Sequence, residues 1–152
     1  MEDIFFTDEY FMKQALIEAQ KAFDIGEVPV GCVVVSNNQI IGKGHNLTEQ
    51  LNDVTAHAEM QAITAAANYL GAKYLNDCTI YISLEPCVMC AGAIFWAQFE
   101  RVVFAAKDEK RGFENAMVKL HPKTKIHSGI LANEAAELMK SFFNKLHIQF
   151  IL

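Results

Sequence analysis

The sequence predicts an α/β fold in which helices cover both faces of a central mixed sheet. Helical patterns alternate along the chain with short, almost wholly apolar runs, and such runs are typical of strands buried on both faces. The chain has 152 residues, enough for one substantial core, and shows no repeat, low-complexity segment or linker. We therefore expect one domain over residues 1–152, with a three-layer α/β/α architecture and a five-stranded sheet.

The first helix should begin after Thr7, whose hydroxyl can accept a backbone N–H at a helix start. Asp8 and Glu9 would lie at the positive end of the helix dipole, where acidic side chains are favoured, and Gly26 would end the helix. Its apolar stripe contains Phe11, Ala15, Ala19 and Phe23.

A hairpin is expected next. Val28–Val35 is rich in β-branched residues and nearly all apolar, which predicts a central strand. Asn37–Asn38 is a turn signal, and Ile40–Ile41 begins the return strand. A loop through Asn46 and Asp53 then leads to the next helix.

The remaining chain continues the alternation. Met60–Leu70 has a helical pattern that Gly71 would end, and another helix should start at Pro86. Both helices would begin at the carboxyl ends of neighbouring strands, where α/β proteins usually place their sites. The other expected elements are strands over 78–84, Arg101–Ala106 and Ile126–Ile130, a polar stretch over 107–124 with at most a short helix near Asn115, and a last helix from about Asn133 that points Leu138, Met139, Phe142, Phe143 and Leu146 inward.

Four residues supply the chemistry that a metal-activated water attacking a base would need. His57 offers an imidazole nitrogen and Cys87 and Cys90 offer thiolates. A structural zinc site usually has four protein ligands, whereas a catalytic one has three and leaves a position for water. Glu59, two residues after the histidine, would then be free to move protons.

The spacing of these residues fits two helix starts. Cys87 and Cys90 are three apart, so they share one face of a helix, and Pro86 is a favoured first residue. The positive end of the helix dipole also favours thiolate over thiol. Residues two apart converge only in a first helical turn, which is where His57 and Glu59 are expected.

The cysteines and histidines also have simpler interpretations. A single Cys-x-x-Cys could be a redox pair or half of a structural zinc site. Cys32 and Cys78 lie in apolar runs and are expected to be small buried hydrophobes. The other histidines have no ligand-like neighbour in the sequence, and these are His45, His121, His127 and His147.

Composition limits the possible partners and compartments. The formal net charge is −5 and the pI is about 5.5, which argues against nucleic-acid affinity through bulk charge but not against a local basic patch. No apolar stretch approaches the ~20 residues of a membrane span, the start of the chain is acidic rather than signal-like, and the cysteines provide no disulfide framework. A cytoplasmic location without membrane association is expected.

His-x-Glu followed by Pro-Cys-x-x-Cys matches the known signature of zinc nucleobase deaminases. Beyond that signature, the chain resembles bacterial tRNA-specific adenosine deaminases from about Tyr10 to Phe143. The segments that carry this resemblance are Glu27–Gly31, Asn46, Thr55–Glu59, Leu84–Ala93 and Arg101–Phe104. The resemblance implies a cytidine-deaminase-like fold, one Zn²⁺ per subunit, a homodimer, and conversion of adenosine to inosine at the wobble position of a tRNA anticodon loop.

The resemblance also implies roles for individual residues. Zinc would be held by His57, Cys87 and Cys90, and Glu59 would be the proton shuttle. Asn46 would hydrogen-bond the target base, and Asp108 would contact a ribose hydroxyl beside it. Further contacts implied in the same way are Pro29 and Val30 as walls of the base pocket, the Ala58 N–H toward the base, and Phe143 near the bound loop, although an inward-facing core position would explain Phe143 equally well.

Two departures leave alternatives open. The chain ends in the nearly apolar segment 144–152 where the family often has a basic helix, and Phe95–Gln98 also differs from the pattern. Phosphate contacts supply much of nucleic-acid affinity, so the lysines and arginine near the active-site strand would have to compensate. These are Lys107, Lys110, Arg111, Lys119, Lys123 and Lys125. The alternatives are a deaminase of a free base or nucleoside such as guanine, cytosine or cytidine, and a catalytically silent zinc-binding subunit, against which Glu59 speaks.

Overall fold

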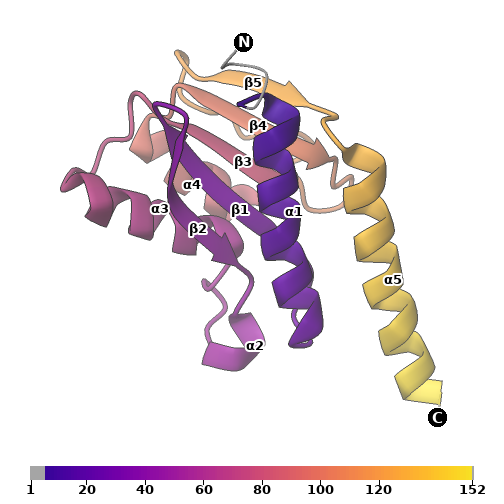
Figure 1. Cartoon of the computed structure of the whole chain (residues 1–152). Coiled ribbons are helices and arrows are strands. Elements are labelled where there is room, and N and C mark those ends of the chain that lie inside the picture. The colour runs from indigo at the N-terminus through magenta and orange to yellow at the C-terminus, as the bar shows by residue number, and fades with distance from the viewer. Residues whose placement is uncertain (1–5, 152) are drawn as a thin grey trace.

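The computed structural model describes residues 6–151, and its side chains through residue 147. The elements, in chain order, are α1 (Asp8–Asp24), β1 (Gly31–Ser36), β2 (Gln39–His45), α2 (Thr48–Leu51), α3 (Ala58–Leu70), β3 (Thr79–Leu84), α4 (Val88–Ala97), β4 (Arg101–Ala106), β5 (Lys125–Ser128) and α5 (Ala132–Ile151). Figure 1 shows the sheet between α1 and α5 on one side and α3 and α4 on the other. The expected three-layer α/β/α arrangement is confirmed.

The sheet is five-stranded and mixed, with the order β2-β1-β3-β4-β5. β1 is antiparallel to both β2 and β3, while β3, β4 and β5 run parallel. β2 and β3 therefore point the same way but lie on either side of β1. α3, which comes after β2 and the short α2, and α4, which comes after β3, begin at the same edge of the sheet. The strands β2 and β3 are not, however, the neighbours expected from the sequence.

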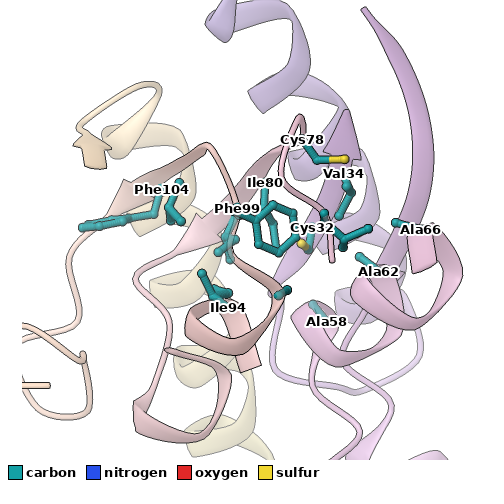
Figure 2. Packing of buried hydrophobic residues seen from close by; sticks show 14 of the residues in the cluster. Cys32, Val34, Ala58, Ala62, Ala66, Cys78, Ile80, Ile94, Phe99 and Phe104 are labelled. Carbon is teal, nitrogen blue, oxygen red and sulfur yellow. The ribbon is translucent and has the colours of Figure 1, made fainter. Parts of the chain in front are cut away.

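Alternate residues of the central strands build two cores. Val33, Tyr81 and Val103 face the side of α1 and α5, where they pack with Phe11 and Ala135. The residues one position away along the strands belong to the other core, because successive side chains of a strand point to opposite faces. That second core lies against α3 and α4 and is shown in Figure 2.

Small residues let α3 approach the sheet closely. Ala58, Ala62 and Ala66 are fully buried along one side of this helix, as Figure 2 shows. Opposite them, a Cβ at Gly44 would overlap the carbonyl oxygen of Ala58, and one at Gly42 would overlap that of Ala62. The first turn of α3 is thus held against β2 by backbone-to-backbone contact.

Several predicted boundaries are corrected by the structure. Val28–Val30 lies before β1 rather than in it, because Pro29 has no N–H for a ladder and Val30 N donates back to Val28 O at 2.8 Å. The N-cap of α4 is Cys87, with extended backbone (φ −72, ψ 175), so Pro86 precedes the helix instead of starting it. β5 is Lys125–Ser128 rather than 126–130.

The loops and the last helix also differ in part from expectation. The loop after Asn46 contains the short helix α2, and residues near Asn115 form turns instead of a helix. In α5, Phe142 is 4% exposed but Phe143 is 49% exposed, because adjacent helical residues point about 100° apart. Within residues 6–151, no helix is long and apolar enough to cross a membrane.

Candidate active site

The first turns of α3 and α4 bring three potential metal ligands together. His57 is the N-cap of α3, Cys87 is the N-cap of α4, and Cys90 lies in the first turn of α4. Their donor atoms all lie within 4.8 Å of one another. The structure thus assembles the three residues that the sequence predicts, and it does so at helix N-termini, as the spacing requires.

The distances between these donors fit a tetrahedral zinc site. His57 Nδ1 lies 3.6 Å from Cys87 Sγ and 3.5 Å from Cys90 Sγ. Zn–N and Zn–S bonds of about 2.05 and 2.3 Å at a tetrahedral angle would place N and S roughly 3.6 Å apart. One nitrogen and two sulfurs suit zinc, and they leave one position of the tetrahedron without a protein ligand.

The two thiols differ in their tendency to ionise. A hydrogen bond from the Cys90 thiol, helped by His57, lowers the pKa of Cys87 to about 4. The same bond and burial raise the pKa of Cys90 far above its usual value, and the interaction with Cys87 raises the pKa of His57. Without metal these shifts leave Cys87 as a thiolate and favour protonated Cys90 and His57. Zinc would displace the protons of Cys90 and His57, because it binds thiolate and neutral imidazole.

Glu59 lies in the first turn of α3 and is 3% exposed. Burial raises the pKa of its carboxyl to about 7. Glu59 and His57 line the same cavity, as their two-residue spacing at a helix start predicts. A buried carboxyl with a pKa close to neutral can both accept and release a proton at physiological pH.

A cavity of about 820 Å³ opens above these residues. Of the substrate contacts expected from the sequence, Val30, Asn46, Asp108 and Phe143 line it. Pro29 and Ala58 are buried and lie outside the lining. Val28, which the sequence analysis did not single out, lines the wall that was expected from Pro29.

Asn46 and Ala58 are bonded to each other. The Ala58 N–H donates to Asn46 Oδ1 at 2.9 Å in a buried position. This bond fixes the orientation of the amide, because only the oxygen can accept from the backbone N–H. Asn46 Nδ2 is then the group left for a ligand, so this side of the cavity offers a donor, while the Ala58 N–H is already in use.

The opposite wall is formed by the segment 107–114, here called the rim loop, and by one face of α5. Five consecutive residues of the rim loop, Lys107 to Arg111, line the cavity. α5 contributes Ala136, Met139, Lys140 and Phe143. The cations of the rim loop were expected from the sequence, but Lys140 and Met139 were not expected in the cavity, because no local pattern distinguishes a cavity-facing residue of α5 from an ordinary helical one.

Glu85 was also missed. It directly precedes Pro86, is 5% exposed and lies in the cavity lining. Its side chain accepts two hydrogen bonds from the rim loop. In the sequence it is an acidic residue at the end of an apolar strand, within the segment Leu84–Ala93 that carries the family resemblance, and neither feature gives it a role.

Comparison with known proteins agrees with this geometry. Residues 6–106 match the family profile described as the cytidine and deoxycytidylate deaminase zinc-binding region. A tRNA-specific adenosine deaminase of Aquifex aeolicus is 43% identical over 143 residues, which cover 91% of this chain and 95% of that protein.

Two solved structures extend the comparison. One, from studies of A-to-I editing by tRNA:A34 deaminases at the wobble position, is 39% identical with a TM-score of 0.77, covering 85% of this chain and 98% of that one. A guanine deaminase of Bacillus subtilis is 44% identical with a TM-score of 0.62, but covers 65% of this chain and 64% of that one. The chain therefore belongs to the zinc-binding cytidine and deoxycytidylate deaminase family, within the branch of the tRNA-specific adenosine deaminases.

Proposed function

We propose that the protein is a zinc-dependent hydrolase that converts adenosine to inosine at the wobble position of tRNA anticodons. The observation that carries this proposal is the buried carboxylate of Glu59 in the same cavity as the His57, Cys87 and Cys90 donor set. The chain is related to tRNA-specific adenosine deaminases over 91% of its length. The reaction replaces the C6 amine of adenine with oxygen from water and releases ammonia.

His57, Cys87 and Cys90 would hold one Zn²⁺ per subunit. Zinc bound there would supply a water acidic enough to lose its proton near neutral pH. Glu59 accepts that proton on its carboxylate and delivers it to the ring nitrogen of the base as the water oxygen bonds to C6. It then moves the proton of the new C6 hydroxyl to the amine, which leaves as ammonia while C6 becomes a carbonyl. Burial, which raises the pKa of this carboxyl above its usual range, favours a group that must both accept and release a proton at the same pH.

The other side chains position the base. Val28 and Val30 provide an apolar wall, and Asn46 donates through Nδ2 to an acceptor on the purine. Asp108 is placed on the rim loop to accept a hydrogen bond from a ribose hydroxyl, and Phe143, half exposed at the mouth, offers a ring against which a neighbouring nucleotide packs.

The anticodon loop would be recognised by a local cationic surface and not by the overall charge, which is negative. Lys107, Lys110, Arg111 and Lys140 all line the mouth of the cavity. Their positive charges would face the phosphates that flank a nucleotide inserted into the cavity. The apolar end of the chain, residues 148–152, lies outside the described side chains.

We further propose that the chain acts as one domain, forms a homodimer and works in the cytoplasm. A dimer interface is supported by an exposed stripe at four-residue spacing on α4, where Val88 is 50% and Trp96 is 73% exposed and the surface at Gly92 between them is open. Exposed apolar groups of this kind are enriched at subunit interfaces. A cytoplasmic location is supported by the free cysteines, because cytosolic thiols are kept reduced, and by the proposed tRNA substrate.

Deamination of guanine is the second candidate function, favoured by the 44% identity to the B. subtilis guanine deaminase. A substrate panel separates the two. Zinc-loaded protein is incubated with tRNA carrying adenosine at the wobble position, free adenosine, guanine, cytosine and cytidine, and inosine and ammonia are measured. Inosine in tRNA alone is the expected result. Ammonia from a free base or nucleoside with unchanged tRNA would overturn the proposal.

A further inference from the structure

Glu85 is a buried carboxylate that the reaction does not use. It follows β3 and directly precedes Pro86 and the ligand Cys87. Its backbone N–H donates to Ala106 O at 2.8 Å, so its main chain continues the pairing of β3 with β4. Its side chain is 5% exposed and turns toward the rim loop. Burying a carboxylate in this way lowers the stability of the fold unless its oxygens accept hydrogen bonds.

Both oxygens of Glu85 accept backbone hydrogen bonds from the rim loop. Oε1 accepts from Asp108 N at 3.0 Å, and Oε2 accepts from Glu114 N at 3.0 Å. The two donors lie at opposite ends of the rim loop. One side chain therefore sets the positions of both ends of the segment that carries Asp108, Lys110 and Arg111.

Gly112 closes the arrangement from inside the rim loop. A Cβ at this position would overlap Cδ and both oxygens of Glu85, so the carboxylate lies directly against the Gly112 backbone. Gly112 N also donates to Asp108 O at 2.8 Å, which turns the loop around the carboxylate. Gly112 does not have a positive φ. A glycine is therefore needed here for space beside the carboxylate and not for its backbone conformation.

The rim loop is also hydrogen-bonded to the residues just before α4, which include the metal-ligand candidate Cys87. Phe113 N donates to Pro86 O at 3.0 Å, and Cys87 forms a β-bridge with Gly112. The rim loop and the start of α4 are therefore registered against each other over three consecutive residues, Glu85, Pro86 and Cys87. These contacts set the distance between the catalytic residues and the rim loop. They therefore also set where Asp108 and the loop cations lie relative to a nucleotide whose base reaches Glu59.

We propose that Glu85 is a positioning residue that holds the rim loop in the conformation that receives the nucleotide flanks. It acts through the Asp108 and Glu114 amides. Its effect on substrate rests on the proposed function, whereas its effect on the loop does not. Glutamine at this position keeps the size of the side chain but offers a single accepting oxygen, so one of the two amides loses its partner.

The test compares Glu85→Gln with Glu114→Gln in the full-length zinc-loaded protein. Glu114 lies in the same loop and is exposed, so its substitution removes one carboxylate without removing an acceptor for the loop amides. Hydrogen exchange of the Asp108 and Glu114 amides is measured together with zinc content, and kcat and KM are measured with wobble-adenosine tRNA.

For Glu85→Gln we expect exchange of at least one of these amides to accelerate about tenfold or more, with zinc retained. KM for tRNA should rise about tenfold while kcat changes less than about threefold. Glu114→Gln should leave all of these values within about twofold of the wild-type protein. Because the exchange does not depend on substrate, it tests the loop contact even if tRNA is not deaminated.

Unchanged protection of both amides in Glu85→Gln would overturn the proposal, as would loss of kcat at unchanged KM. If Glu85→Gln does not fold, Gly112→Ala is the second variant, because its methyl group displaces the same carboxylate from the loop side. Faster exchange at Asp108 and Glu114 in Gly112→Ala supports the proposal, and unaltered exchange contradicts it.

Discussion

The two sides of the cavity are constructed differently. On one side, His57, Glu59, Cys87 and Cys90 lie in the first turns of two regular helices, and α3 is held against the sheet by the close approach of Gly42 and Gly44. On the other, Asp108 and the cations lie on an irregular loop. The side chain of Glu85 accepts hydrogen bonds from two amides of that loop. Within the loop, Asp108 Oδ1 accepts from Lys110 N and Arg111 N at 3.1 and 3.0 Å.

This difference in construction corresponds to the two tasks of the proposed reaction, which are catalysis and binding of the nucleic acid. Groups that bind metal and transfer a proton must hold their geometry closely, so they are placed on regular elements. Groups that face a flexible nucleic acid lie on a loop, which can differ between related proteins without disturbing the core. The side with the helices should therefore govern zinc and chemistry, and the side with the rim loop should govern affinity.

The largest effect is expected from Cys87→Ala. Removing one of three ligands should lower zinc content from one per subunit to a small fraction and abolish turnover, because the two remaining donors cannot hold the metal. Metal analysis of the purified variant measures this directly. Cys78→Ala is the control, since Cys78 is a buried cysteine that precedes the start of β3, whereas Cys87 follows the other end of that strand. Full zinc in Cys87→Ala would show that the ligand assignment is incorrect.

Glu59→Ala should separate metal binding from chemistry. The variant is expected to retain zinc while kcat falls by about 10³-fold or more, because the proton shuttle is lost. Turnover is measured as inosine formed, with Glu134→Ala as a control at an exposed position of α5. Turnover within about tenfold of the wild-type rate would remove Glu59 from the proton-transfer role.

Reversing charge on the rim loop should affect binding. Lys110→Glu with Arg111→Glu is expected to weaken tRNA binding about tenfold or more and to flatten its dependence on salt, because two phosphate contacts are lost. Lys13→Glu with Lys43→Glu introduces the same charge change at two exposed positions away from the cavity. An equal salt slope for both double variants would mean that the rim loop cations do not contact phosphate.

A smaller effect is expected away from both sides of the cavity. Asp8 accepts from Arg101 at 2.7 and 3.1 Å and from Tyr81 Oη at 2.7 Å, which fastens α1 to β3 and β4. Asp8→Asn should lower the free energy of unfolding by about 1–2 kcal/mol at pH 7, as measured by urea denaturation. Zinc content and tRNA affinity should be unchanged.

The pH dependence of that difference has a defined sign. Hydrogen bonding to Arg101 lowers the pKa of Asp8, so its stabilisation is present above the unfolded pKa of about 3.9 and is lost as pH falls through the lower folded value. The difference between wild-type protein and Asp8→Asn should therefore shrink below about pH 4. A difference that is the same at pH 7 and pH 3 would show that the charge of Asp8 does not contribute.

The same contrast explains what could be predicted from the sequence. Helix and strand types follow from local periodicity, and the ligand set follows from spacings of two and three residues at helix starts. The short helix α2 and the role of Glu85 were not predicted, because in each a distant partner determines the backbone. The free N–H groups at the start of α2 donate to the side chain of Glu27, from Glu49 N at 3.1 Å and from Gln50 N at 2.7 Å. Glu27 lies 22 and 23 residues before these donors in the sequence. No local signal marks that contact.

Glu85 follows the same rule, because its partners lie 23 and 29 residues away in the sequence. Phe143 illustrates a different limit. An apolar pattern places Phe142 and Phe143 together inside, but a helix can bury only one of two adjacent side chains against the same neighbour. The structure buries Phe142 and leaves Phe143 at the mouth of the cavity.

The central claim is that one side of the cavity performs the chemistry and the other recognises the RNA. The affinity of zinc-loaded Glu59→Ala for wobble-adenosine tRNA tests it most directly. We predict a Kd within about threefold of the wild-type value in a variant that forms no inosine, since the rim loop and α5 are untouched. Loss of tRNA binding in this variant, with zinc and fold retained, would contradict the separation of the two sides.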